Sequence, residues 1–243
     1  MRISYGITVC NEFEELQTLL NFIQAHKREI DEIVVLVDVS NTTDEILDYL
    51  KNNNYNTIEA ELNNDFATFK NNLLNHCQGT YIIQLDADEI PSVEFMESIH
   101  LGLEESENNG VDVIFVPRYN HVIGITNEWI DKWGWNINPG KLTTSKKENI
   151  TDGYYQVLEK YELIASENED DITYFEPMNN WPDFQGRILM NNGVIHWKEK
   201  VHERLDGFNR GAHTPSHMYL NHIKTLEKQI QQNDKYENIF PVV

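Results

Sequence analysis

The feature that most constrains the fold of this chain is an apolar run, residues 81–85, that stops at three carboxylates. The run is rich in β-branched side chains, and Asp86, Asp88 and Glu89 follow it directly. A short apolar run of this composition predicts a buried strand. In open α/β sheets, ligands bind in the crevice outside the carboxyl ends of the strands. We therefore expect Asp86 and Asp88 to reach a ligand-binding edge of a sheet, the alternative being an idle acidic turn.

Two closely spaced carboxylates at such an edge are suited to a divalent cation. Acidic side chains repel each other unless a cation joins them. Mg²⁺ is usually held by one or two carboxylates together with the phosphates of a substrate. The sequence therefore predicts Mg²⁺ or Mn²⁺ as a cofactor that holds a diphosphate at this edge.

The chain before this run alternates between strand and helix patterns. Strand-like runs occupy residues 3–9, 33–37 and, more weakly, 57–62, and residues with helical spacing lie between them. This alternation predicts a parallel sheet with right-handed crossovers. The turn after the first strand has neither a Gly-x-Gly-x-x-Gly pattern nor a Gly-rich loop with a lysine. A dinucleotide-binding domain and a P-loop enzyme are therefore both disfavoured.

Polar residues predict where three helices begin. Asn11, with Glu14 three residues later, is expected to form a capping box at the first helix. Asp65 and Ser92 are expected to cap two later helices, because each directly precedes a segment with helical spacing.

Composition and charge limit the possible partners. The chain has 243 residues, 40% of them hydrophobic, which is enough for one large domain with its own core. Its 19 basic and 40 acidic residues give a formal net charge of −21, which disfavours nucleic acid and anionic lipid as partners. No apolar run approaches the length of a membrane span. Cys10 and Cys77 show neither disulfide nor metal-ligand spacing, which fits a reducing compartment and predicts a cytoplasmic protein.

Four motifs in the first part of the chain resemble, in their order and separation, the nucleotide-sugar motifs of family 2 glycosyltransferases. The motifs are Ile7-Thr8-Val9-Cys10-Asn11-Glu12, Val37-Asp38 with Ser40 and Asp44, Lys70-Asn71-Asn72, and Leu85-Asp86-Ala87-Asp88-Glu89. The resemblance implies an α/β fold of the GT-A type, a Rossmann-like single domain with a mostly parallel central sheet flanked by helices. Residues 1–118 would then bind the nucleotide-sugar. Residues 119–243 would bind the acceptor, supply the catalytic residues and end in a helix.

The same resemblance implies roles for individual residues at the donor site. Asn11 and Glu12 are expected to bind the nucleotide-sugar. The roles are Thr8 and Asp38 near the base, Lys70 near base or phosphate, Asp86 near the ribose and among the metal ligands, and Asp88 on the metal. Family members often have proline at the position of Val9 and arginine at that of Lys70. Lysine keeps the charge of arginine but loses its planar fork, so a bidentate contact is not expected here.

A second block resembles the C-terminal half of family members related to lipopolysaccharide-core glucosyltransferases. It runs from Trp181-Pro182-Asp183 through Arg187 to Val201-His202-Glu203. The resemblance implies that Arg187 lies by acceptor or phosphate and that Asp183 or Glu203 is the base that removes the acceptor proton. We favour Asp183. The alternatives are a cap after Pro182 for Asp183, and for Glu203 a surface ion pair with a neighbouring Arg204 or Lys200.

The end of the chain offers a candidate metal-binding histidine. In the family a late histidine often returns to the metal, and His222 matches that position, with His202 as the competing candidate. A histidine at a helix start is otherwise a packing or capping residue. A final amphipathic helix is expected after His222. The apolar tail after it, from Ile239 to Val243, is expected to dock on the body or on a second subunit.

The segment between the two blocks has few regular patterns. Trp129, Trp133 and Trp135 could stack on sugar rings or seal a loop onto the core. Residues 141–175 lack a clear period and are expected to form an irregular lid or acceptor loop.

These patterns together predict a metal-dependent, inverting glycosyltransferase. The expected donor is a nucleotide-diphospho-sugar, UDP-linked by the frequency of such donors in the family, and the expected acceptor is a hydroxyl of a glycan or glycoconjugate. One alternative is a sugar nucleotidyltransferase, although the Gly-rich basic loop that such enzymes carry after the first strand is missing. The other alternative is a non-enzymatic carbohydrate-binding module that uses the three tryptophans.

Overall fold

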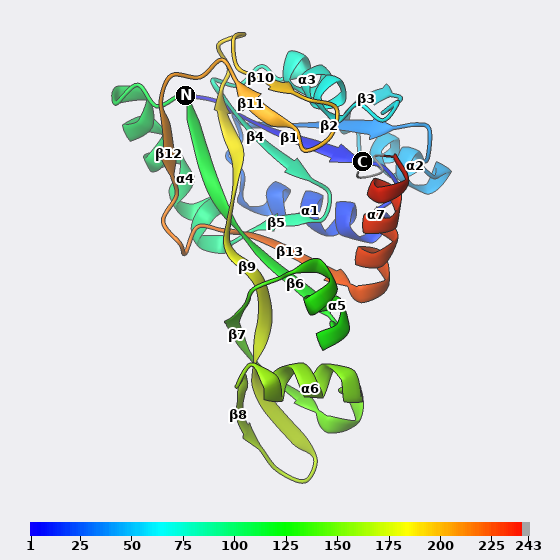
Figure 1. Ribbon diagram of the computed structural model, residues 1–243. Helices are drawn as coiled ribbons and strands as arrows, with labels where there is room; N and C mark the ends of the chain where they lie inside the picture. The colour runs from blue at the N-terminus through cyan, green and yellow to red at the C-terminus, as the bar shows by residue number, and fades with distance from the viewer. Residues whose placement is uncertain (240–243) are drawn as a thin grey trace. The chain divides into compact units, whose positions relative to one another are not determined.

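The computed structural model describes residues 1–239, with the side chains of residues 1–234 (Figure 1). Residues 240–243, most of the apolar tail, lie outside the described residues. Contacts within the chain group it into two compact units. The first comprises Met1–Pro117 and Phe184–Asn221, and the second comprises Arg118–Asp183 and His222–Val243. Residues 184–221 thus belong to the first unit, beyond the boundary at residue 118 that we drew for the donor-binding half.

The first unit is built on a mostly parallel sheet. Its parallel strands lie in the order β3-β2-β1-β4, and the last residues of β9 pair antiparallel with β4. These strands are β1 (Ile3–Val9), β2 (Glu32–Asp38), β3 (Asn56–Ala60), β4 (Tyr81–Asp86) and β9 (Asp171–Met190). The remaining strands with residues in this unit are β5 (Glu89–Pro91), β6 (Val113–Ile123), β10 (His196–Lys198), β11 (Arg204–Asp206), β12 (Gly211–His213) and β13 (Leu220–Thr225). The predicted parallel sheet is confirmed.

Helices cover both faces of this sheet. Helices α1 (Phe13–His26), α2 (Asp44–Asn52) and α4 (Val93–Asn108) share a buried apolar cluster with one face, and α3 (Phe66–His76) shares a second cluster with the other. Residues 33–37 of β2 are all apolar because this part of the strand is buried on both faces. Val35 faces the first cluster, and Val34 and Leu36 face the second. Each such side chain, once fully buried, stabilises the fold by about 1.5–3 kcal/mol. The predicted α/β class, a mostly parallel sheet flanked by helices, is confirmed.

Two of the three predicted helix caps are confirmed. Asp65 accepts a hydrogen bond from the N–H of Thr68 at 2.9 Å, and Ser92 accepts one from the N–H of Phe95 at 3.2 Å. The capping box of Asn11 is wrong, because α1 begins at Phe13 and its N-cap residue is Glu12. The Glu12 carboxylate instead accepts the N–H groups of the turn before the helix.

The second unit has more regular structure than the sequence indicates. It contains α5 (Asn127–Trp133), β7 (Ile137–Lys146), the short 3-10 helix η1 (Lys147–Asn149), α6 (Asp152–Lys160), β8 (Ile164–Glu167) and α7 (Leu226–Ile239). Strands β7 and β8 pair antiparallel with β9. The irregular loop expected over residues 141–175 is therefore wrong. The predicted C-terminal helix is confirmed as α7.

The three tryptophans of the second unit form a ladder of rings. The ring centroids of Trp129 and Trp133 are 4.8 Å apart, and those of Trp133 and Trp135 are 4.6 Å apart. All three pack, partly buried, against the apolar core of this unit, and Lys132 covers a face of Trp129. This packing agrees with a role in sealing the segment. Sugar stacking stays a prediction.

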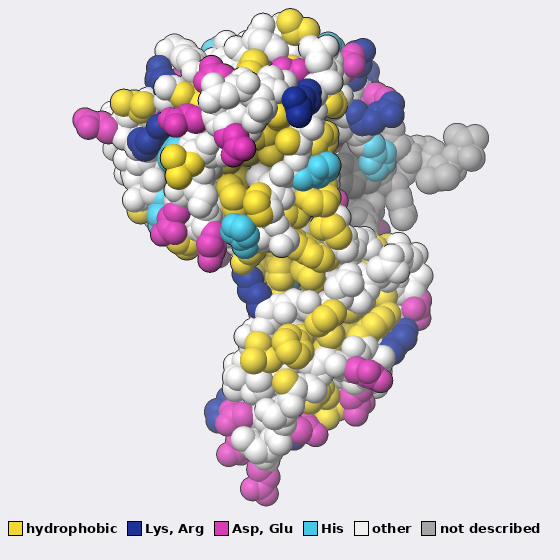
Figure 2. Space-filling view, turned by 90° about the vertical axis from the view of Figure 1, so that its left-hand side faces the viewer, with side chains coloured by type: hydrophobic (Ala, Val, Ile, Leu, Met, Phe, Trp, Pro, Cys, Tyr) yellow, Lys and Arg dark blue, Asp and Glu magenta, His cyan; other side chains and the backbone are white. Residues whose placement is uncertain are grey.

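The acidic side chains on one face of the molecule do not gather in a single patch (Figure 2). Figure 2 shows one face of the molecule, on which acidic side chains are scattered among polar and hydrophobic ones instead of forming one patch. Among residues 1–239, no helix is both long and apolar enough to span a bilayer.

Candidate functional site

The carboxyl ends of β1 and β4 bring Thr8 and Asp86 together. The two residues lie opposite each other in the register of these parallel strands. The Thr8 hydroxyl donates a hydrogen bond of 2.7 Å to Oδ1 of Asp86. The expectation that Asp86 stands at a sheet edge beside Thr8 is thus met by the geometry. The roles of both residues toward a donor stay predictions.

Arg187, on β9, holds the other oxygen of Asp86. Its Nη2 donates to Oδ2 of Asp86 at 2.8 Å and to Oε1 of Glu89 at 2.5 Å. Oε2 of Glu89 in turn accepts the backbone N–H of Asp86 at 3.2 Å. Sequence reasoning gave Glu89 no role. The local sequence signal for a buried carboxylate here is that the apolar residues Ile90 and Pro91 follow Glu89 directly.

Lys70 brings a second cation to Asp86. It is buried on α3, and its Nζ lies 4.0 Å from Oδ1 of Asp86. Nζ is also paired with Glu203 and lies 4.9 Å from the centre of the Trp197 ring. The ring is fixed in turn, because its Nε1 donates to Oε1 of Gln84 at 2.7 Å. Glu203 therefore pairs with the buried Lys70. The alternative of a surface ion pair between Glu203 and Arg204 or Lys200 is wrong.

These charges decide the ionisation of Asp86. Burial alone would raise the pKa of Asp86, but the cations Lys70 and Arg187 outweigh it and lower the pKa well below the ordinary aspartate range. Asp88 opposes them slightly, because a second negative charge raises the pKa. Asp86 is therefore a permanent anion near neutral pH whose charge is already balanced by two cations.

Asp38 ends β2 and holds the loop that follows β3. Its Oδ1 accepts hydrogen bonds from the N–H and hydroxyl of Ser40, at 3.1 and 2.6 Å, and from the N–H of Leu62 at 3.0 Å. Burial would raise the pKa of Asp38, but these hydrogen bonds lower it below its usual value. The Cys10 sulfur lies 3.8 Å from Oδ2. Asp38 therefore has a structural role in addition to the predicted contact with a base.

Asn11 and Glu12 lie in the turn between β1 and α1. The side chain of Asn11 is exposed, whereas Glu12 uses Oε2 to accept the N–H groups of Cys10 and Asn11 at 2.9 and 3.1 Å. Glu12 thus fixes the turn beside Thr8, and Asn11 is the residue of this pair whose side chain faces solvent.

In the second unit, Asp183 forms a separate polar cluster. Its Oδ2 accepts two N–H groups of Arg118, at 2.9 and 2.6 Å, and the Nδ2 group of Asn120 at 2.8 Å. Oδ1 of Asn120 contacts Nδ1 of His222 at 2.7 Å. The predicted base and the predicted metal-binding histidine are therefore joined through one amide. Sequence reasoning missed Arg118 and Asn120, for which the two polar residues two positions apart in the otherwise apolar β6 are the available signal.

This cluster fixes the tautomer of His222. Nδ2 of Asn120 faces the Asp183 carboxylate, so its Oδ1, which can only accept, must face the imidazole. Nδ1 of His222 therefore carries the hydrogen, and in the neutral ring Nε2 keeps a lone pair. A histidine whose second nitrogen is held in this way is typical of metal sites.

The candidate metal ligands lie in both units. Asp86 and Asp88 belong to the first unit, and His222 to the second. Asp88 is half-buried in the turn after β4. The competing candidate, His202, is exposed and has a positive φ of 55°. Within residues 1–239, no three His, Cys, Asp or Glu side chains are close enough to hold a metal by themselves.

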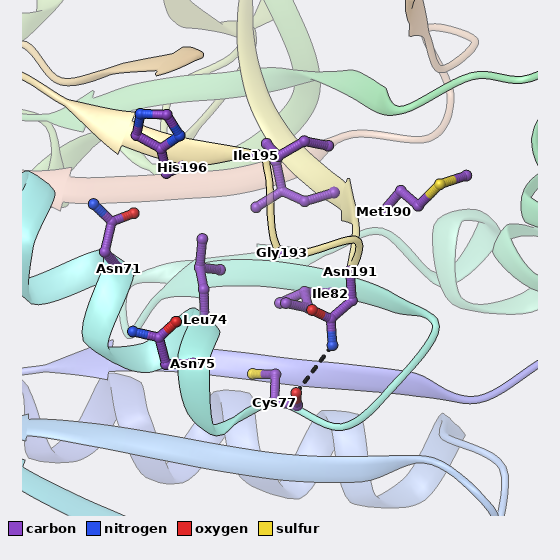
Figure 3. A pocket seen from close by; sticks show the side chains of 11 residues that line it. Asn71, Leu74, Asn75, Cys77, Ile82, Met190, Asn191, Gly193, Ile195 and His196 are labelled. Atoms are coloured by element: carbon purple, nitrogen blue, oxygen red, sulfur yellow. Dashed lines mark hydrogen bonds between the residues drawn. The ribbon is translucent and has the colours of Figure 1, made fainter. Parts of the chain in front are cut away.

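A cavity of about 420 Å³ in the first unit lies away from these residues. Figure 3 shows it between α3, β4 and the end of β9, with a lining that includes Asn71, Leu74, Asn75, Cys77, Ile82 and Asn191. Ile82 lies about 13 Å before Asp86 along β4, at a rise of roughly 3.3 Å per residue. The side-chain N–H groups of Asn191 donate to the carbonyls of Cys77 and Gly79. The candidate site is therefore the charged cluster at the strand ends, and not this cavity.

Comparisons with known proteins agree with this fold. No curated protein sequence matches the chain. Among solved structures, residues 1–349 of S. aureus TarS in complex with UDP-GlcNAc match with a TM-score of 0.54 and 15% identity, over 92% of this chain and 59% of that one. A second structure of TarS 1–349 matches with a TM-score of 0.53 and 14% identity, over 92% and 60%. The chain thus spans about three fifths of the TarS chains that it matches, and the likeness shows the fold.

The sequence itself identifies the family. The model of the family described as "Glycosyl transferase family 2" matches residues 4–157, which is more than half of the chain. The matched range includes β1, β2, β4 and the carboxylates that follow them. This protein belongs to glycosyl transferase family 2.

Proposed function

We propose that this protein transfers a sugar from a nucleotide-diphospho-sugar to a hydroxyl group of a glycan or glycoconjugate, with inversion and with a divalent metal. One observation carries the proposal. In a chain of net charge −21, two buried cations, Lys70 and Arg187, converge on Asp86 at the carboxyl end of the middle strand. Open α/β sheets bind ligands at such an edge, and here the two cations offset most of the negative charge of Asp86, Glu89 and Glu203, which would otherwise repel a diphosphate.

The donor would lie along the ends of β1, β2 and β4. In the family pattern, Thr8 and Asp38 are near the base, Asp86 is near the ribose and Lys70 is near base or phosphate, of which we infer the phosphate. Lys70 suits its role because a buried ammonium group is a compact charge that binds phosphate oxygens well. Because a solved TarS structure holds UDP-GlcNAc, we infer UDP-linked sugars as the first donors to test.

The metal would be held by Asp88. A half-buried carboxylate is a suitable ligand for Mg²⁺ or Mn²⁺, and one or two carboxylates with donor phosphates complete such sites. Asp86, with both oxygens already hydrogen-bonded, is the weaker candidate of the two. A ligand role for His222, which belongs to the second unit, stays a prediction. When bound, the metal would supply Lewis-acid stabilisation of the leaving diphosphate.

Asp183 would act as the base. It must accept the proton of the acceptor hydroxyl as that oxygen attacks the anomeric carbon of the donor. Arg118 and Asn120 hold its Oδ2 in place, so the carboxylate would meet the acceptor in one orientation. Glu203 is the alternative base, and its pairing with Lys70 makes its charge part of the donor site. The cytoplasmic location stays a prediction.

A thermal-shift and turnover experiment tests the proposal. The protein would be incubated with UDP and with UDP-GlcNAc, each with and without Mn²⁺. A ligand that binds only the native state at 100 times its Kd stabilises it by about 2.7 kcal/mol, so UDP with Mn²⁺ should raise the Tm. Asp88→Ala should abolish the Mn²⁺-dependent part of this rise. Glu94→Ala, an exposed position on α4, is the matched control.

Product analysis separates the proposal from its alternatives. Release of a nucleoside diphosphate from a nucleotide-sugar supports a glycosyltransferase. In a separate incubation with UTP and a sugar 1-phosphate, formation of a nucleotide-sugar with release of pyrophosphate would instead identify a nucleotidyltransferase. Sugar binding with no dependence on a nucleotide would identify a binding module.

A further inference from the structure

One buried ion pair holds Asp86 at two points. Oε2 of Glu89 accepts the backbone N–H of Asp86 at 3.2 Å. Oε1 of Glu89 accepts Nη2 of Arg187 at 2.5 Å, and the same Nη2 donates to the side chain of Asp86 at 2.8 Å. The main chain and the carboxylate of Asp86 are therefore both fixed by the same two residues.

Burial makes this arrangement rigid. The side chain of Glu89 is 0% exposed and that of Arg187 is 4% exposed, whereas that of Asp86 is 34% exposed. Water cannot replace the contacts of Glu89 and Arg187, but the exposed part of Asp86 can still meet a ligand. The pair thus lies behind Asp86, on its protein side.

The pair is poorly suited to stabilising the fold alone. Desolvation of two charges offsets most of their attraction, so apolar side chains of similar volume often serve a core as well or better. Within the described part of the chain, Nε of Arg187 is also buried without a hydrogen-bond partner, which adds a further cost. A geometric role for the pair accounts for both features.

We propose that Glu89 and Arg187 are positioning residues of the donor site, which set the place of the Asp86 carboxylate before the nucleotide arrives. The inference rests on the proposed function, in which Asp86 contacts the ribose. It assigns Arg187 a role through Asp86, where the family resemblance placed Arg187 directly on acceptor or phosphate. It also gives Glu89 its first role.

The test measures UDP binding and stability in the same variants. Glu89→Gln and Arg187→Met each remove one charge of the buried pair and leave the other charge less well compensated, and both should lower the free energy of unfolding measured in urea. The double variant Glu89→Met with Arg187→Met removes both charges and should recover much of that loss. Its Kd for UDP, measured by calorimetry with Mn²⁺ present, should nevertheless stay about tenfold or more above that of the unaltered protein, since a contact with a charged group is misplaced.

The KM for the donor is a second measurement, and a loss of stability alone would leave it unchanged. With UDP-GlcNAc as donor and water as acceptor, Glu89→Gln should raise the KM for the donor about tenfold. Partial unfolding would lower the apparent kcat and leave this KM unchanged. Glu94→Gln, on an exposed position of α4, is the matched control and should change neither constant.

The outcomes are distinct. If the double variant recovers stability and binds UDP as tightly as the unaltered protein, Glu89 and Arg187 are structural and the inference is overturned. If the double variant does not fold, Glu89→Gln decides, and an unchanged donor KM would overturn the inference. If the unaltered protein binds neither UDP nor another nucleoside diphosphate, the proposed function itself fails, and this inference fails with it.

Discussion

The two polar clusters of this protein use similar groups in different surroundings. In the first unit, the Arg187–Glu89 pair is almost fully buried, with exposed side-chain fractions of 4% and 0%. In the second unit, the Arg118–Asp183 pair is partly open, with exposed fractions of 22% and 24%. Buried charges have no water to replace a lost partner, whereas exposed charges do. The first cluster is therefore suited to fixing a geometry, and the second to exchanging a proton.

The sharpest way to break this comparison is to remove the carboxylate that we assign as the base. Asp183→Ala should lower kcat by about 10²–10⁴-fold, which is the range for loss of a general base. The unfolding free energy should change by only about 1 kcal/mol or less, because the lost pair is partly exposed. Release of UDP under saturating donor and acceptor measures the first quantity, and urea denaturation the second.

Glu203→Ala is the counterpart in the first unit. It should leave Lys70 paired with Asp86 alone, and its effect should fall on the KM for the donor more than on kcat. If Asp183→Ala kept near-normal turnover while Glu203→Ala lost it, the base assignment would be reversed and the open cluster would have no chemical role.

The next largest effect is expected on the unfolding free energy, when the buried arginine of the first cluster is replaced. Arg187→Met should lower the unfolding free energy by about 3–5 kcal/mol, because Glu89 then remains as a buried charge that has lost its contact with the Arg187 guanidinium. Denaturation in urea at pH 7 measures this change through the midpoint at constant slope. A loss below about 1 kcal/mol would show that water reaches Glu89, and the contrast between the two clusters would disappear.

A smaller effect is expected for the matched change in the second unit. Arg118→Met also removes the arginine of an arginine–carboxylate pair, yet it should lower the unfolding free energy by about 0–1 kcal/mol, since solvent reaches both partners. The kcat should fall as well, because Asp183 loses two of its hydrogen-bond donors. Arg204→Met is the control at an exposed position with an acidic neighbour, and it should leave kcat unchanged.

The same contrast in burial explains what could be predicted from the sequence. Strands buried on both faces leave a continuous apolar run, so β1, β2 and β4 are visible in the sequence, and so is the acidic turn after β4. Strand β7 is half-exposed and rich in polar residues, such as Thr143 and Thr144, whose hydroxyls bond to Glu176 and Thr173. Its strand character depends on pairing with β9, which no local pattern reveals.

Site contacts follow the same rule. Thr8 and Asp86 could be placed together because each stands at the end of a recognisable strand. The partner of Lys70 is 133 residues away in sequence and that of Glu89 is 98 residues away, so tertiary packing alone decides both pairs. Neighbours in sequence, such as Arg204 beside Glu203, predicted the wrong partner because a buried lysine has the stronger need for a counter-charge.

The smallest expected effect concerns acid stability, and it tests the first unit alone. The pKa of Asp38 is lower in the folded state than the ordinary aspartate value of about 3.9, because hydrogen bonds outweigh its burial. The unfolded chain therefore binds a proton at a pH where the folded chain does not. Stability from Asp38 is complete above pH of about 4 and is lost as the pH falls through the folded pKa.

Asp38→Asn isolates this contribution, because asparagine keeps an oxygen that can accept the N–H groups of Ser40 and Leu62. Urea denaturation between pH 2 and pH 6, as round limits, should show a shallower loss of stability for the variant below pH of about 4. The difference in slope cannot exceed one proton, about 1.4 kcal/mol per pH unit. Asp131→Asn, at an exposed position of the second unit, is the matched control. Equal slopes for Asp38→Asn and the unaltered protein would mean that these hydrogen bonds do not lower the pKa of Asp38 in the folded state.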